Sequence, residues 1–184
     1  MRKFLCVIDM QEDFVRGALG SPAAETIVPK VVEKIRNTPE EDYIIYTQDT
    51  HEDDYLEFGL EGQKLPVKHC VRGTKGWELI PEVKAPFIEI GIEPMSIYKA
   101  TFGSFTLAEY IDEMVDVEGM FEEEVEIELC GLCTDICVIS NALILRAYFP
   151  NTKIIVDSSC CAGTSPEAHE AALAVMRSCQ IDVI

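Results

Sequence analysis

Basic side chains are scarce in this sequence. Its 184 residues hold 15 Lys and Arg against 33 Asp and Glu, which gives a formal net charge of −18 at pH 7. Nucleic acids and anionic membrane surfaces are polyanions, so they repel such a chain. We therefore expect neither as a partner, and we attribute the surplus of acidic side chains to solubility.

Long hydrophobic runs are missing as well. The first apolar stretch ends at Asp9, too soon for the core of a signal peptide, and no later stretch approaches the roughly 20 apolar residues of a membrane span. On this basis we expect a cytoplasmic protein. The eight Cys residues are then expected as reduced thiols, because disulfide frameworks belong to small secreted domains without a sufficient core.

Glycine-rich nucleotide-binding motifs, internal repeats and low-complexity segments are also absent, so a dinucleotide or P-loop function has no support. The sequence instead alternates short apolar segments with amphipathic ones. We expect Pro29 near the first turn of the first helix. The pattern predicts one domain over residues 1–184, with a three-layer α/β/α fold and a six-stranded, largely parallel sheet. Strands are expected at residues 3–8, 43–47, 87–90, 125–129, 153–156 and 181–184, and helices at 25–36, 104–115, 137–149 and 165–176.

The segment 124–149 dominates the chemistry. It is expected to form a strand, a tight turn at Gly131 and a helix that begins at Thr134 or Asp135, both of which are favoured N-cap residues. This places Cys137 in the first helical turn. Unpaired N–H groups and the helix dipole favour a thiolate there and lower a Cys pKa from about 8.5 toward neutrality. Cys137 is therefore the candidate nucleophile.

Two charged residues fall where the strands are expected to end. Asp9 follows a nearly continuous apolar strand, and in open α/β sheets the functional crevice lies outside the carboxyl ends of the strands. Lys99 lies in a loop rich in aromatic and small residues, as expected for a cation held in a crevice beside anionic groups. The alternatives are that Asp9 lies in a turn whose acidic side chains are merely solvated, and that Lys99 is an ordinary loop lysine.

A second constellation contains Asp49, His51 and His69. One carboxylate and two imidazoles supply three protein ligands and leave positions open for water or substrate, as a catalytic divalent metal site requires. Two of the three His residues of the whole chain fall in this window. Glu57 or Glu61 could add a further carboxylate, and the alternative is a pair of surface histidines.

Asp9 with Gln11 and Phe14, Lys99, and the motif GLCTDICV at residues 131–138 together resemble the isochorismatase-like cysteine hydrolases, the superfamily that contains the nicotinamidases. The resemblance runs over essentially the full length of the chain. In that family the catalytic set is an Asp after the first strand, a Lys after the third and a Cys at the start of the helix after the fourth. These roles would fall here on Asp9, Lys99 and Cys137.

The resemblance implies further details of the site. Members usually carry a non-proline cis peptide in this motif, implied here at Leu132–Cys133, and the backbone N–H groups of Cys133 and Cys137 would form the oxyanion hole. Relatives of nicotinamidase type bind zinc or another divalent ion, and we expect zinc. Its ligands would be Asp49, His51 and His69.

The implied activity is hydrolysis of a small primary amide through a thioester, with nicotinamide to nicotinate and ammonia as the leading case. Members that cleave isochorismate lack the catalytic Cys, so that activity is disfavoured. Thr50 and Ala100 replace a Trp and a Gly common in nicotinamidases, which keeps other amides, ureido and carbamoyl compounds as alternatives. Phe14 would supply an apolar wall for a planar ring, or else pack in the core. Relatives are commonly dimers or tetramers, and we expect a homodimer or homotetramer.

Other functional classes remain open on the sequence. Cys130, Cys133 and Cys137 could indicate a redox or metal-thiolate protein. Thioredoxin-type pairs place their first Cys at the helix start, however, whereas Cys130 belongs to the strand. A catalytically silent relative is the third class. We expect His169 and the other cysteines to be structural.

Overall fold

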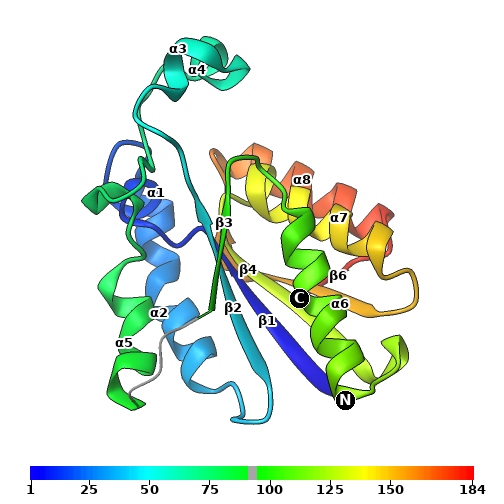
Figure 1. Cartoon of the computed structure of the whole chain (residues 1–184). Coiled ribbons are helices and arrows are strands. Elements are labelled where there is room, and N and C mark those ends of the chain that lie inside the picture. Colours follow the sequence, from blue (N-terminus) through cyan, green and yellow to red (C-terminus); the bar gives the residue numbers. More distant parts are fainter. Residues whose placement is uncertain (91–94) are drawn as a thin grey trace.

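The computed structural model describes residues 1–90 and 95–184 and contains one six-stranded, fully parallel sheet (Figure 1). The strand order is β3-β2-β1-β4-β5-β6. This arrangement confirms the predicted fold class and strand number. The strands are β1 (Arg2–Ile8), β2 (Tyr43–Asp49), β3 (Met95–Lys99), β4 (Val125–Leu132), β5 (Lys153–Ala162) and β6 (Asp182–Val183).

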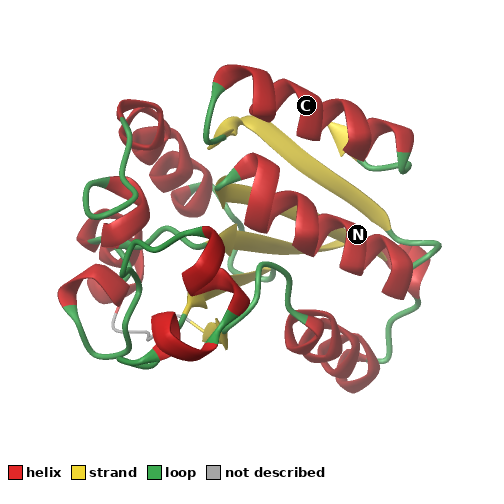
Figure 2. Cartoon of the chain, turned by 90° about the horizontal axis from the view of Figure 1, so that it is seen from above, coloured by secondary structure: helices red, strands yellow, loops and turns green. Residues whose placement is uncertain are grey.

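Helices cover both faces of the sheet. In Figures 1 and 2, α2 and α5 lie on one side, and α6, α7 and α8 lie on the other. The short α3 and α4 project beyond the carboxyl edge of the sheet (Figure 1). The helices are α1 (Glu12–Val15), α2 (Pro22–Arg36), α3 (Tyr55–Phe58), α4 (Leu60–Lys64), α5 (Pro81–Ile90), α6 (Phe105–Glu118), α7 (Ile139–Tyr148) and α8 (Pro166–Ser178), with shorter turns η1 (Lys75–Trp77), η2 (Glu122–Glu124) and η3 (Thr134–Val138).

Serine caps set the start of the three long helices. Ser21, Ser104 and Ser165 each accept a hydrogen bond from the N–H three residues on, which satisfies one of the free donors of the helix N-terminus. The sequence placed the starts of α6 and α8 at these serines, residues 104 and 165, but not the start of α2. The prediction that Pro29 marks the first turn of α2 was wrong, because Ser21 and Pro22 start the helix two turns earlier and Pro29 lies inside it.

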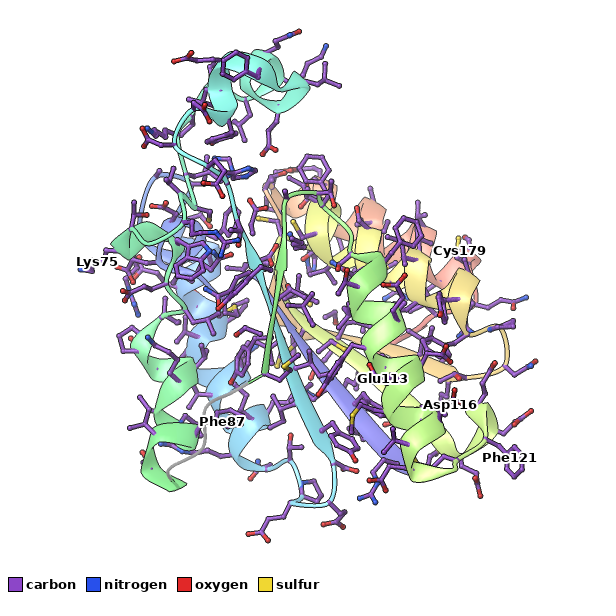
Figure 3. All side chains as sticks on the ribbon, viewed as in Figure 1. Lys75, Phe87, Glu113, Asp116, Phe121 and Cys179 are labelled. Carbon is purple, nitrogen blue, oxygen red and sulfur yellow. The ribbon has the colours of Figure 1, made fainter. Side chains whose placement is uncertain are left out.

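The prediction of a strand at residues 87–90 was also wrong. These residues belong to α5, and Figure 3 shows the Phe87 side chain on this helix. Phe87 packs edge-on against Tyr46 with a ring-centroid distance of 5.6 Å, and Tyr46 donates a hydrogen bond to the carbonyl of Val83. A short apolar run does not distinguish a strand from a buried helical turn. The third strand is β3, in the segment expected to be a loop. Residues 91–94 of that loop lie outside the described part of the chain.

The register of the sheet brings the predicted site residues to one edge. Asp49 pairs with Lys99 at the end of β2 and β3, and Ile8 pairs with Gly131 at the end of β1 and β4. Asp9 therefore follows β1 at the same edge. Among the helices of the described residues, none is long and apolar enough to span a membrane.

Gly131 controls how closely β1 and β4 approach at this edge. Its φ is +119°, and a Cβ atom built on it would lie 2.1 Å from the backbone oxygen of Ile8. Only glycine fits this conformation and this contact. The strands that carry Asp9 and the Cys137 turn thus meet through a residue without a side chain.

We predict that Gly131→Ala destabilises the fold by several kcal/mol, about 1–3 kcal/mol from overpacking plus a similar backbone strain. Gly119→Ala is the matched control, because Gly119 also has a positive φ, +66°, but its added Cβ meets nothing within 4 Å. The control should lose only about 1–2 kcal/mol. Urea unfolding of both variants measures the difference, and equal losses would show that the close approach at Gly131 is not a constraint.

Candidate active site

Three side chains from three elements meet at the carboxyl edge of the sheet. Lys99 Nζ lies 2.6 Å from Asp9 Oδ2 and 3.5 Å from Cys137 Sγ. All three residues are at most 5% exposed. The structure thus brings together the carboxylate, the ammonium and the thiol that the sequence singled out from separate parts of the chain.

The carboxylate of Asp9 is held on both of its oxygens. Thr47 Oγ1 donates to Asp9 Oδ1 at 2.6 Å, and Lys99 pairs with Oδ2. Burial raises the pKa of Asp9, and the charge of Lys99 opposes that shift. For Lys99, burial lowers the pKa, but the neighbouring Asp9, Cys137 and Asp49 outweigh burial and raise it. The two residues form a charged pair out of contact with bulk water.

The prediction of a low pKa for Cys137 was wrong. Burial raises the pKa of this thiol well above its usual value, and the carboxylate of Asp9 adds to the effect, while Lys99 opposes it. The dipole of a helix start acts weakly by comparison with the loss of solvation in a closed site. At neutral pH Cys137 is therefore a neutral thiol next to a carboxylate, and it needs that base to become a nucleophile.

Cys137 lies in a widened helical turn. The carbonyl of Cys133 accepts hydrogen bonds from the N–H groups of Ile136 at 3.0 Å and Val138 at 3.1 Å, and the five-residue spacing of the second bond is that of a π-turn. The turn begins at Thr134, one of the two residues at which the sequence placed the start of the helix, and follows the expected cis peptide at Leu132–Cys133. Its N-cap residue is Cys133 rather than Thr134 or Asp135.

A group of four potential metal ligands lies next to the thiol. One nitrogen or oxygen atom from each of Asp49, His51, Glu61 and His69 lies within 4.8 Å of the others. Asp49 Oδ2 is 3.0 Å from His51 Nε2 and 3.4 Å from His69 Nε2, and Glu61 Oε1 is 3.6 Å and 3.4 Å from the same nitrogens. Of the two glutamates left open by the sequence, Glu61 on α4 belongs to this group, and Glu57 is exposed.

The chemistry of this group fits a divalent cation. Burial raises the pKa of Asp49, but its contacts with His51 and His69 hold it below its ordinary value, so the carboxylate stays charged. Burial lowers the pKa of His69, yet Asp49 and Glu61 raise it to about 10. The two acids therefore attract positive charge, as a proton or as a metal ion. Two imidazoles and two carboxylates suit zinc, iron or manganese.

Neighbouring groups orient the two imidazoles. His69 Nδ1 donates to the carbonyl of Val67 at 2.7 Å, which leaves Nε2 as the free ligand atom. The ring of Tyr55 stacks on His51 with a centroid distance of 4.0 Å, and its hydroxyl lies 3.0 Å from His69 Nδ1. Both rings are thus fixed with Nε2 toward the carboxylates.

Gln11 fixes the end of β2, a role that the sequence pattern did not reveal. Its side-chain oxygen accepts from the N–H of Asp49 at 2.7 Å, and its amide group donates to the carbonyls of Asp49 and Trp77 at 2.8 Å. The indole N–H of Trp77 donates to Thr50 Oγ1 at 2.8 Å. Thr50, which departs from the usual family pattern, is therefore covered by Trp77 from a later loop.

A cavity of about 340 Å³ opens onto these groups. Asp49, Glu61, His69 and Cys137 line its polar side. The sequence anticipated one of its apolar wall residues, Phe14, which also belongs to the core, and two others, Leu132 and Ile136, lie in the motif at residues 131–138; Leu19, Leu65 and Phe102 come from separate parts of the chain and carry no local signal. The apolar wall is formed by Phe14, Leu19, Leu65, Phe102, Leu132 and Ile136.

The cysteines do not form a thiol cluster suited to redox or metal chemistry. All eight are free, and Cys130 is fully buried in β4, where burial raises its pKa. Cys179 follows α8, in the outer helical layer (Figure 3). In the described part of the chain, the only group with the spacing of a metal site is the one around Asp49.

Comparison with known proteins places this geometry in a family. The model of the isochorismatase domain matches residues 3–184. A nicotinamidase of Schizosaccharomyces pombe is 27% identical over 98% of this chain and 91% of its own length. The crystal structure of the nicotinamidase/pyrazinamidase PncA from Bacillus subtilis superimposes with a TM-score of 0.82 at 28% identity, over 100% of this chain and 99% of that one.

A third relative bears on the metal. The crystal structure of the pyrazinamidase of Pyrococcus horikoshii was determined in complex with zinc, and it superimposes with a TM-score of 0.78 at 27% identity, over 100% of this chain and 99% of that one. The family match spans nearly the whole sequence, and the fold agrees with it. This chain belongs to the isochorismatase family.

Proposed function

We propose that this hydrolase of the isochorismatase family cleaves a small primary amide through a thioester on Cys137, with nicotinamide to nicotinate and ammonia as the leading reaction. The observation that carries the proposal is the contact of Lys99 with both Asp9 and Cys137, directly beside the Asp49 metal group. The nicotinamidase and pyrazinamidase relatives support it. The whole of residues 1–184 would form one hydrolase domain.

In the first half-reaction, Asp9 takes the proton of the Cys137 thiol and the sulfur attacks the amide carbonyl. The carboxylate is within hydrogen-bonding reach of the thiol, and its raised pKa suits it to hold that proton. The N–H groups of Cys133 and Cys137 stabilise the oxyanion. Asp9 then protonates the departing nitrogen, so ammonia leaves and the acyl group remains on sulfur.

In the second half-reaction, Asp9 removes a proton from a water molecule, which attacks the thioester; the C–S bond breaks, the acid is released, and Asp9 passes the proton back to the sulfur of Cys137. Lys99 stays charged throughout and balances the negative charge that passes between Asp9 and the sulfur. A divalent ion held by Asp49, His51, Glu61 and His69 would supply Lewis acidity and a binding point for a ring nitrogen. We propose zinc for this position.

The cavity supports a small planar substrate. Its volume of about 340 Å³ is at the lower end of the ~300–1,000 Å³ of small-molecule sites, and Phe14 and Phe102 supply aromatic walls. A substrate whose amide group lies at Cys137 would direct its ring toward the metal group. Other small amides, ureido and carbamoyl compounds are the second candidates, because Thr50 and Ala100 change the surroundings of the site.

We also propose a homodimer or homotetramer in a reducing compartment such as the cytoplasm. Large apolar side chains are exposed, including Phe58, Leu60, Phe105 and Phe102, the last of which lines the cavity, and a second copy of the chain could cover them. Eight free thiols suit a reducing environment. Light scattering of the active enzyme tests the assembly, and a fully active monomer excludes it.

We predict that Cys137→Ala lowers amide hydrolysis by at least ~10³-fold, because the nucleophile is lost. Cys133→Ala is the control, since only its backbone N–H is used, and it should retain activity within a few-fold. Ammonia release by both purified variants measures the effect. An active Cys137→Ala enzyme would remove the thioester mechanism.

We predict about one divalent ion per chain in protein purified without chelators, bound ~10–100-fold more weakly in Glu61→Gln. Glu57→Gln is the matched control, because Glu57 lies in α3, four residues before Glu61, and outside the ligand group. Elemental analysis and metal titration compare the two variants. Equal affinities would show that Glu61 is not a ligand.

We predict faster ammonia release from nicotinamide than from benzamide, with a ratio of at least ~10²-fold in kcat/KM. Benzamide has the same shape but lacks the ring nitrogen, so it leaves the metal group without its contact. An ammonia assay over a small panel of amides measures this. Rapid release from an aliphatic amide alone would keep the mechanism and discard nicotinamide, and release from none would discard the enzyme class.

A further inference from the structure

Helix α8 and the loop before it hold the turn that carries Cys137. His169 Nδ1 and Thr134 Oγ1 form a hydrogen bond of 2.8 Å, and Thr134 is fully buried. One residue on, Asp135 accepts hydrogen bonds from the N–H of Thr164 at 2.8 Å and from its hydroxyl at 2.5 Å. Both side chains that could have capped the turn from within thus bind to α8 or to the loop before it.

The other end of the turn is held by Asn141, one turn further along in α7. Its amide group donates to the carbonyls of Cys137 at 2.8 Å and Phe102 at 3.2 Å, and its oxygen accepts from the N–H of Ser104 at 3.0 Å. Neither Asn141 nor His169 is among the described residues that line the cavity. Asn141 and His169 therefore contact the turn from outside the cavity.

The turn itself has little internal support. It is a five-residue π-turn without a side-chain cap, and it contains or borders both N–H groups assigned to the oxyanion hole. Oxyanion donors act only at hydrogen-bonding distance from the developing charge, so a displacement of about 1 Å costs about 10²-fold in rate. Thr134 is the first residue after the cap Cys133, so a hydrogen bond to its side chain resists such a displacement.

We propose that His169 is a positioning residue for catalysis: through its hydrogen bond to Thr134 it fixes the turn that presents the Cys133 and Cys137 N–H groups to the reacting carbonyl. This role rests on the proposed thioester mechanism and adds to it a side chain outside the cavity. His169 does not contact the substrate. Its loss should therefore weaken stabilisation of the transition state more than binding of the substrate.

The test compares variants that remove the hydrogen bond with variants that keep it. His169→Ala and Thr134→Val remove it, whereas His169→Asn keeps a polar atom near the position of Nδ1 and Thr134→Ser keeps the hydroxyl. Ile181→Val is the control for simple loss of stability, because Ile181 is a buried core residue beyond the far end of α8. All are made in the full-length chain.

We expect kcat for nicotinamide, or for the best amide of the panel, to fall ~10–100-fold in His169→Ala and Thr134→Val, with KM within about threefold of wild type. The double variant should lose no more than either single one, because both remove the same contact. The Asn and Ser variants should recover most of the activity. The control should lower the melting temperature and leave kcat unchanged.

Hydrogen exchange supplies a readout that does not depend on activity. Amides of residues 132–138 should exchange faster in His169→Ala and not in the Ile181→Val control. If the wild-type protein hydrolyses no amide but His169→Ala still exchanges faster at residues 132–138, the proposed function is refuted while the hold of His169 on the turn stands. An active enzyme whose kcat and exchange are unchanged by His169→Ala, or whose two losses are additive, would overturn the role of His169.

Discussion

The ion pair of Asp9 and Lys99 is the interaction on which the rest of the site depends. Both groups are withdrawn from solvent at the sheet edge, and Lys99 Nζ is 2.6 Å from Asp9 Oδ2. Burial shifts the pKa of each group toward its neutral form, and the charge of its partner opposes that shift. Removing one partner would leave an uncompensated buried charge, at a cost of about 3–5 kcal/mol. The same two charges act in opposite directions on the Cys137 thiol. Burial raises the pKa of the thiol, Asp9 adds to that shift and Lys99 opposes it, so the sulfur stays protonated until a base removes the proton.

The strand order explains why these residues can meet. The chain passes from β1 to β2 and β3 on one side and from β4 to β5 and β6 on the other, so β1 and β4 flank the point where the direction of winding reverses. Ligands of open α/β sheets bind in the crevice outside the carboxyl ends of the strands at that point. Gly131 lets β1 and β4 approach closely there. The metal group lies beside this crevice, at the end of β2, where Asp49 Oδ1 is 3.8 Å from Lys99 Nζ.

The sequence predicted the features that depend on local pattern. Apolar runs followed by Asp9 and Asp49 indicated two strands and the place of their acids, and helical patterns indicated the starts of α6 and α8. Features set by tertiary contacts were missed. The run at 87–90 is helical because it packs on Tyr46 and β2, and Glu61 differs from Glu57 only through the way α4 folds back over the histidines. The pKa of Cys137 was misjudged because burial, which no local pattern reveals, exceeds the effect of the helix start.

The central claim is that catalysis passes through an acyl group on Cys137. Acid quenching of the enzyme during turnover of an amide substrate, followed by mass spectrometry of its peptides, tests that claim most directly. The account predicts that the peptide containing Cys137 gains the mass of the acyl group, that the gain disappears on treatment with hydroxylamine, and that it is absent from Cys137→Ala. An enzyme that turns over the amide but carries no acyl group on Cys137, or carries one on another side chain, would contradict it.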